Sequence, residues 1–68
     1  MSRLLTPEEE RIIALVASGL RNKDIAEIVG TTEDGVKGHL KTIFHKTGSQ
    51  TRMQLALWYV KRSPIQAA

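Results

Sequence analysis

Apolar residues recur along the chain at helical spacing, in four periods separated by polar and glycine-containing turns. The first period begins after Thr6-Pro7-Glu8-Glu9, where Thr6 can cap a helix, Pro7 suits its first position and Glu9 can complete a capping box. Gly19 ends the apolar stripe, so we expect a helix over about 7–18.

Two further helices follow, joined by a short turn. Asn22 can cap a helix over about 23–29, which Gly30 ends. Its inward-facing residues are expected to be Ile25, Ala26, Ile28 and Val29. Thr32 can cap the next helix, over about 33–47. Two helices joined by such a tight turn make a helix-turn-helix unit.

The helix over 33–47 closes at Gly48 and has two contrasting faces when its residues are advanced by about 100° each. The apolar arc holds Val36, Leu40, Ile43, Phe44 and Thr47. The opposite arc holds Asp34, Gly38, Lys41, Thr42 and His45, with Lys37 at its border. We expect the first arc to pack in the core and the second to meet a polar partner.

The fourth helix, over about 52–61 with Thr51 as its cap, is apolar on two sides. One stripe consists of Met53, Ala56, Leu57 and Val60. The other side carries Leu55, Trp58, Tyr59 and Arg62. A terminal helix of this kind needs two surfaces to bury. Residues 63–68 contain Pro64 and no pattern, so we expect a disordered tail there.

These features predict an all-α fold: a four-helix (tetrahelical) helix-turn-helix domain that occupies residues 1–68 as a single unit. So short a chain buries only about 60% of its unfolded surface, so the core has little stability to spare. Cysteine is absent, which excludes disulfides and thiol catalysis, and a cytoplasmic location is expected. The chain shows neither a signal-peptide apolar segment nor a run of about 18 apolar residues, so no membrane partner is expected.

Charge is distributed unevenly along the chain. Residues 1–34 hold four basic and seven acidic side chains, whereas residues 35–68 hold six basic side chains and no acidic one. The whole chain carries a net charge of +3 and has a pI near 9.7. A half-chain without a carboxylate points to a polyanionic partner. A solvated basic surface with no partner is the alternative that charge alone leaves open.

An enzymatic function is not expected. His39 and His45 lie six residues apart on one helix, which does not bring them to one ligand face as a spacing of four would. The glycines interrupt or end helices and do not form a phosphate loop after a strand. We therefore expect no catalytic residue, no metal site and no cofactor.

Double-stranded DNA explains the basic residues better. The second helix of a helix-turn-helix unit enters the major groove, so Lys37 and Lys41 could donate to guanine, while Gly38 brings the backbone close to the bases. Residues at helix starts and flanks could hold phosphates: Asn22, Lys23, Thr32, Thr42, Lys46 and Arg52. For each of these, capping or simple exposure is the alternative. RNA is less favoured because Phe44 lies on the core arc and is not a stacking platform.

The ordered set of residues then resembles a known family, the LuxR-type (NarL/FixJ-type) helix-turn-helix domain of bacterial transcription regulators. The resemblance covers roughly residues 4–60. It is carried by Leu5-Thr6-Pro7-x-Glu9, Leu15-Val16-Ala17-x-Gly19-Leu20, Asn22-Lys23-x-Ile25-Ala26, Val36-Lys37-x-His39-Leu40, Ile43, Lys46, Gly48 and Arg52. The family implies that the third helix reads the major groove and that the fourth mediates dimerisation. The resemblance thus assigns Leu55, Trp58, Tyr59 and Arg62 to a dimer interface, and Lys37, Gly38 and Lys41 to base contacts.

Four positions depart from the family pattern. Gly35 replaces a usual Thr, and Gly38 replaces a larger residue that touches a base. Thr47 replaces a usual Leu, and Glu8 a frequent Arg. Glycine within a helix costs about 1 kcal/mol relative to alanine, so our hypothesis is that the two glycines loosen the first turns of the reading helix.

We therefore expect a sequence-specific, homodimeric DNA-binding domain of a bacterial transcription regulator. The family often joins this domain to a receiver or ligand-binding domain, and the sequence is compatible both with a stand-alone regulator and with part of a larger one. The alternative function is a protein-interaction module of the same fold, with DNA binding weakened by the glycines. Such a module would dock RNA polymerase or another regulator through the fourth helix.

Overall fold

The computed structural model describes residues 4–62, which form four α-helices and no strand within that range. The helices are α1 (Pro7–Ala17), α2 (Asn22–Val29), α3 (Glu33–Thr47) and α4 (Arg52–Arg62). The prediction of an all-α, four-helix domain is confirmed, and each predicted helix end lies within one residue of the observed one. The predicted tail, 63–68, lies outside the described residues.

Three of the four predicted caps are present. Thr6 and Glu9 form a reciprocal capping box, in which the Glu9 amide donates to Thr6 Oγ1 at 3.1 Å and the Thr6 amide donates to Glu9 Oε1 at 2.8 Å. The hydroxyl of Thr32 accepts a hydrogen bond from the Gly35 amide at 3.0 Å. That of Thr51 accepts one from the amide three residues later, also at 3.0 Å. These bonds satisfy amides at helix starts that have no partner within the helix.

The start of α2 differs from the prediction. Asn22 is the first helical residue and not the cap, which is Arg21, and the Arg21 side chain makes no capping bond. The side-chain oxygen of Asn22 instead accepts a hydrogen bond from Arg52 at 2.7 Å. A residue 30 positions away in the sequence has thus taken up the acceptor that local capping would have used.

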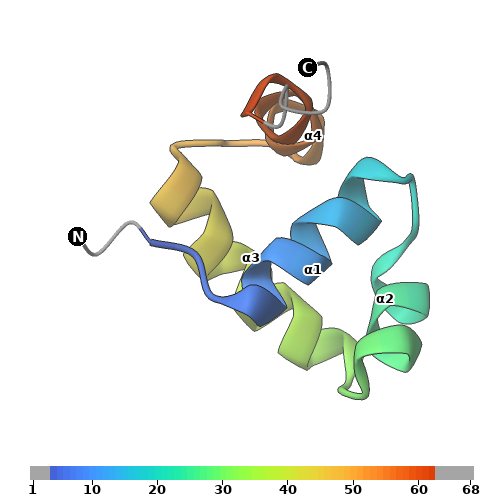
Figure 1. The fold of residues 1–68 in the computed structure, drawn as a ribbon. Coiled ribbons are helices and arrows are strands. Elements are labelled where there is room, and N and C mark those ends of the chain that lie inside the picture. The colour runs from blue at the N-terminus through green and yellow to red at the C-terminus, as the bar shows by residue number, and fades with distance from the viewer. Residues whose placement is uncertain (1–3, 63–68) are drawn as a thin grey trace.

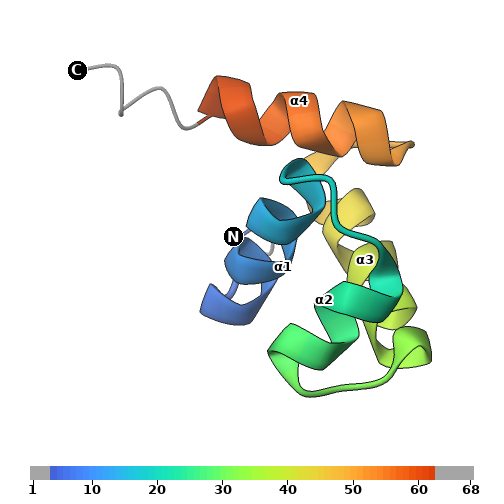
Figure 2. The same ribbon diagram turned by 90° about the vertical axis from the view of Figure 1, so that its right-hand side faces the viewer.

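The helices enclose one small core. Figures 1 and 2 show α4 lying across one end of the domain, above α1, while α2 and α3 pack against each other and against α1. A left-handed glycine, Gly30 at φ +86°, lets the chain turn from α2 into α3. The buried apolar residues are Ile12, Ile13, Val16, Ile25, Ala26, Val36, Leu40, Ile43 and Leu55. The helix-turn-helix pair, α2 and α3, therefore packs on α1, which in turn carries most of the contact with α4.

Most of the predicted apolar arc of α3 is buried. Val36 and Ile43 are fully buried, whereas Phe44 and Thr47 are only partly so. Thr47 directs its hydroxyl to the Ile43 carbonyl and to Ser49 Oγ, both at 2.9 Å. This pairing satisfies a polar side chain where the family pattern has an apolar one.

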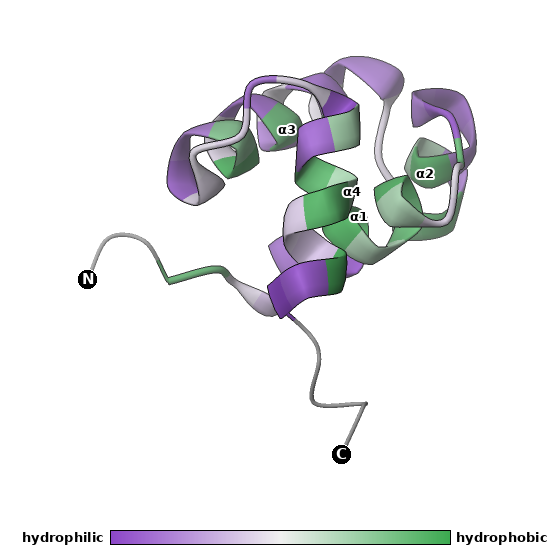
Figure 3. Cartoon of the chain, turned by 90° about the horizontal axis from the view of Figure 1, so that it is seen from above, coloured by the Kyte–Doolittle hydropathy of each residue, from purple (hydrophilic) through white to green (hydrophobic). Residues whose placement is uncertain are grey.

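The two apolar sides of α4 differ in burial. Leu55 is fully buried, and Trp58 and Tyr59 pack against the core. The stripe on the other side is exposed: Met53 is 74%, Leu57 54% and Val60 64% accessible. Figure 3 shows α4 lying over α1, with hydrophobic residues along its middle and hydrophilic ones at both ends. The prediction that Ile28 of α2 faces inward is also wrong, because 46% of its surface is exposed.

None of the helices within residues 4–62 combines the length and the apolar content that crossing a bilayer requires.

Candidate nucleic-acid interface

The predicted contact arc of α3 lies open to solvent. Lys37, Gly38, Lys41 and Thr42 are all exposed. A Cβ atom built on Gly38 would meet no atom within 4 Å. Gly38 is therefore not required by packing within the domain.

Gly35 has a different role. A Cβ atom built there would overlap Thr31 Oγ1 and would lie 3.3 Å from Thr32 Oγ1. The missing side chain thus lets the turn between α2 and α3 pack closely on the first turn of α3. The sequence interpretation treated both glycines as sources of looseness, whereas Gly35 makes room for a tight contact.

Two lysines of α3 share an open depression with the starts of α2 and α4. This depression has a volume of about 320 Å³ and is lined by Asn22, Lys37, Leu40, Lys41, Phe44 and Arg52. The lining includes three basic side chains and no carboxylate. Residues from three helices therefore create one electropositive hollow beside the exposed arc.

Arg52 links two of these helices. Its guanidinium donates to Asn22 Oδ1 at 2.7 Å and to the Leu20 carbonyl at 2.8 Å. The structure thus brings together Asn22 and Arg52, two residues that the sequence analysis placed separately at helix starts. Lys23 and Thr32 are exposed beside α2 and at the start of α3.

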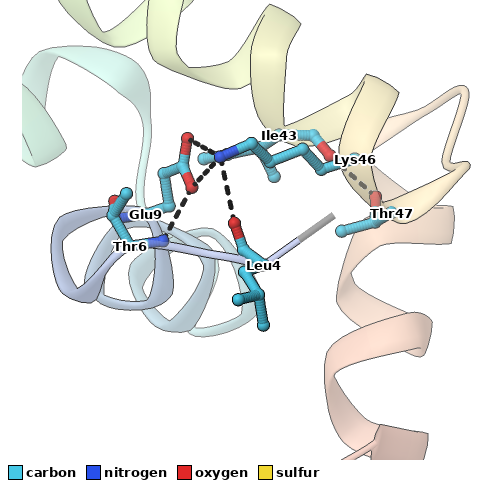
Figure 4. Close-up of polar contacts among 6 residues, drawn as sticks. All are labelled: Leu4, Thr6, Glu9, Ile43, Lys46 and Thr47. Carbon is cyan, nitrogen blue, oxygen red and sulfur yellow. Dashed lines mark hydrogen bonds and ion pairs between the residues drawn. The ribbon is translucent and has the colours of Figure 1, made fainter. Parts of the chain in front are cut away.

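Lys46, which the sequence analysis offered as a phosphate contact, does not line this depression and has partners within the domain. Its Nζ lies 2.8 Å from Glu9 Oε1 and 3.1 Å from Glu9 Oε2, and it donates to the Leu4 carbonyl at 3.1 Å. Figure 4 shows the amine enclosed between these groups. Only 20% of the Lys46 side chain and 8% of the Glu9 side chain are exposed. Lys46 is therefore committed to joining α3 to α1.

The environment of Glu9 also lowers the pKa of its carboxyl group. Burial by itself would raise the pKa of Glu9. The hydrogen bonds from Lys46 and from the Thr6 amide, together with the positive charge of Lys46, outweigh that effect and hold the pKa below its ordinary value. Glu9 is consequently a buried, charged partner in a structural ion pair.

The residues assigned to a dimer interface make contacts within the domain. Leu55 is fully buried and cannot contact a second molecule. Arg62 forms a two-bond ion pair with Glu10, at 2.9 and 2.6 Å, and lies 5.1 Å from the centre of the Trp58 ring. These contacts fasten the end of α4 to α1. The apolar side of α4 that remains exposed is the row formed by Met53, Leu57 and Val60, which we call the outer row.

Neither the outer row nor the Lys46 ion pair was identified as such from the sequence. Both stripes of α4 have apolar residues at helical spacing, so the sequence offers no local signal for which one faces outward. For Lys46, the partner Glu9 lies 37 residues away, and no pattern along the chain connects them.

No metal site is found among the described residues, since they contain no group of three or more His, Cys, Asp or Glu side chains that could hold an ion. His39 is half-buried and His45 is exposed.

Comparison with known proteins places most of the chain in one family. Residues 3–59 match the family described as "Bacterial regulatory proteins, luxR family". The chain is 43% identical over 54 residues to the nitrate/nitrite response regulator protein NarL of Escherichia coli, a match that covers 79% of the chain. It is 34% identical over 61 residues to the uncharacterized transcriptional regulatory protein YxjL of Bacillus subtilis, covering 90% of the chain.

A third relative is the probable transcriptional regulator ycf29 of Pyropia yezoensis, which is 34% identical over 59 residues, or 87% of the chain. The matched region makes up only 25% of NarL, 27% of ycf29 and 28% of YxjL. The chain therefore spans about a quarter of the length of these relatives.

Proposed function

The chain belongs to the luxR family of bacterial regulatory proteins, and from this membership we propose that it binds double-stranded DNA sequence-specifically and regulates transcription. The observation that carries the proposal is the exposed arc of α3, with Lys37 and Lys41 one turn apart on a helix-turn-helix unit. A helix of this kind fits the major groove, and lysine is a donor to guanine O6 and N7.

The contacts divide into two groups. Lys37, Gly38 and Lys41 are proposed to face the bases. The proposed phosphate contacts are Asn22, Lys23, Thr32, Thr42 and Arg52. Lys46 is removed from that group because Glu9 and the Leu4 carbonyl occupy its amine. Phosphate contacts of this type position a protein on DNA, whereas base contacts specify the sequence.

We further propose that two copies pair through α4, using the outer row in place of the residues that the sequence suggested. Met53, Leu57 and Val60 are spaced by four and three residues, so they form one continuous stripe on the helix. All three are more than half exposed. If α4 pairs with α4 of a second copy in antiparallel fashion, Leu57 lies at the centre and Met53 faces Val60 of the second copy.

The outer row also supports a second candidate function, in which the domain docks a different protein such as RNA polymerase or another regulator. An exposed apolar stripe serves either purpose. The two functions differ in their dependence on α3, because only the first requires Lys37 and Lys41.

The test of DNA binding is selection of sites from random duplex DNA with the wild type and with Lys41→Ala. We expect the wild type to enrich one motif, and Lys41→Ala to weaken binding to that motif by about 1–3 kcal/mol. Lys61→Ala, an exposed lysine at the far end of α4, is the matched control and should keep the motif. Binding that ignores sequence and is unchanged in Lys41→Ala would argue for the docking function.

Pairing through α4 is tested on the selected duplex. Leu57→Glu should abolish joint occupancy of an inverted repeat while leaving binding to a single half-site intact. Ile28→Glu, at an exposed apolar residue of α2, is the control. Cooperative occupancy by Leu57→Glu equal to that of the wild type, in a mobility-shift titration, would refute the assignment of the outer row.

A further inference from the structure

The hydrogen bonds of Arg52 fix the orientation of the Asn22 amide. Arg52 Nη1 donates to Asn22 Oδ1 at 2.7 Å, and Nη2 donates to the Leu20 carbonyl at 2.8 Å. The two bonds engage both terminal nitrogens of the planar guanidinium, which holds it in one plane. The guanidinium is therefore a rigid link between the start of α4 and the segment that enters α2.

This arrangement assigns the two ends of the amide. Because Oδ1 is the acceptor for Arg52, the amide nitrogen with its two N–H donors points away from the guanidinium. Nδ2 makes no hydrogen bond to any residue within 4–62, and Asn22 lines the depression described above. The amide thus has unused donors beside an electropositive hollow.

The depression itself suits one chemical group. Lys37 and Lys41 contribute positive charge from α3, Arg52 contributes it from α4, and no carboxylate lines the hollow. Leu40 and Phe44 supply an apolar part of the lining. Donors and cations beside an apolar surface match a phosphodiester group with its attached sugar, because the phosphate accepts hydrogen bonds and the sugar carbons do not.

We propose that this depression seats one backbone phosphate of bound DNA, and that Arg52 is a positioning residue that directs the N–H donors of Asn22 toward it. The inference rests on the proposed function for the presence of DNA against α3. It goes beyond that function in assigning one phosphate to one place, and in giving Arg52 a role through Asn22 and not only through its charge.

The seat is tested with the selected duplex carrying a neutral methylphosphonate at one backbone position at a time. One position per half-site should weaken wild-type binding by about tenfold or more, the factor expected for hydrogen bonds to a charged group. Asn22→Asp retains the acceptor for Arg52 but loses the amide donors, so it should weaken binding to the unmodified duplex similarly. On the duplex modified at that position, Asn22→Asp and the wild type should differ by less than about twofold.

The positioning role is tested with Arg52→Lys, which keeps the positive charge but cannot reproduce the two-bond fork. On the unmodified duplex, we expect Arg52→Lys to lose about as much affinity for DNA as Asn22→Asp does. On the duplex modified at the sensitive position, Arg52→Lys should bind as well as the wild type does. Arg11→Lys is the matched control, since Arg11 also donates to a backbone carbonyl, that of Ile28 at 3.4 Å. Full affinity in Arg52→Lys would show that Arg52 acts only as a charge and would overturn the positioning role.

The outcomes also separate this inference from the proposed function. If the wild type and Asn22→Asp respond equally to every methylphosphonate while the motif still depends on Lys41, DNA binding stands and the seat is refuted. If no motif is enriched, the proposed function fails and the seat fails with it. Thermal melting of Asn22→Asp, expected to match the wild type because the link to Arg52 is retained, ensures that folded protein is compared.

Discussion

Gly35 and Gly38 of α3 show how differently two identical residues can act on one helix. The site of a Cβ on Gly38 is open, whereas a Cβ on Gly35 would meet the hydroxyl of Thr31. Both residues have ordinary negative φ angles, so neither is required by the backbone conformation. What distinguishes them is the turn that packs against the first of the two.

We therefore predict opposite responses to alanine. Gly38→Ala should raise the free energy of unfolding by about 1 kcal/mol, because it restores helix propensity at no steric cost. Gly35→Ala should gain less or lose stability, because Thr31 must move. Adding Thr31→Ala to Gly35→Ala removes the overlapping hydroxyl and should recover part of the gain. Urea denaturation measures all three, and an equal gain from both single substitutions would contradict the packing argument.

Glu9 gives the domain a predictable dependence on pH. Its pKa in the folded protein is lowered, so the unfolded chain binds a proton more readily and acid favours unfolding. The stabilisation is fully present above the unfolded-state pKa and is lost as the pH falls through the lower, folded-state pKa. Urea midpoints at pH 7 and about pH 3 should differ less in Glu9→Gln than in the wild type. Glu8→Gln, an exposed neighbour, should keep the wild-type difference.

At the scale of the element, α4 is a helix whose two apolar sides have separate tasks. One side carries Leu55, Trp58 and Tyr59 and packs on the core, while the outer row faces solvent. The ion pair between Arg62 and Glu10 fastens the far end of the helix to α1. The orientation of α4, and with it the surface proposed for pairing, is set by these contacts within the domain.

Leu55 and Leu57 make a matched pair for this assignment. Leu55→Ala leaves a cavity in the core and should lower the free energy of unfolding by about 2–5 kcal/mol. Leu57→Ala removes an exposed side chain and should change it by less than about 0.5 kcal/mol. Because both residues are leucines of α4, each substitution is the control for the other. The free energies of unfolding of the two variants are measured by denaturation at one protein concentration. A larger loss of stability in Leu57→Ala than in Leu55→Ala would contradict the observed orientation of α4.

At the scale of the whole molecule, side chains distant in sequence connect the four helices. Lys46 joins α3 to α1 and to the segment before it, Arg52 joins α4 to α2, and Arg62 joins α4 to α1. Half of the basic residues that the sequence analysis assigned to DNA contacts or to a dimer interface therefore have partners within the domain. The basic second half of the chain is in part a structural feature.

The substitution Lys46→Met distinguishes a structural role of Lys46 from a role in DNA binding. The substitution leaves Glu9 buried without its partner, so we expect a loss of about 3 kcal/mol, a large part of the stability of a small domain. The slope of log affinity for DNA against log salt should remain unchanged, whereas Lys23→Met, at an exposed lysine proposed to contact a phosphate, should reduce it by about 0.9. The salt titrations are made at a temperature where both variants are folded. An equal reduction in slope for Lys46→Met would restore Lys46 to the phosphate contacts.

The sequence by itself determined the helices and their ends, because those depend on interactions within a few residues. The capping box at Thr6 and Glu9, the cap at Thr32 and the stop at Gly30 all join neighbours in the chain. The apolar arc of α3 was also predictable, since only one of its faces is apolar. These signals, together with the resemblance to a family, were sufficient to predict the fold class.

Tertiary structure alone decided how polar and ambiguous residues are used. Asn22 accepts from Arg52 instead of capping, Lys46 pairs with Glu9, and Leu55 is buried while Leu57 is exposed. In each case the deciding partner lies on another helix, or the two faces of one helix are equally apolar. Local pattern cannot rank such alternatives, because the energy that separates them arises only when distant segments pack together.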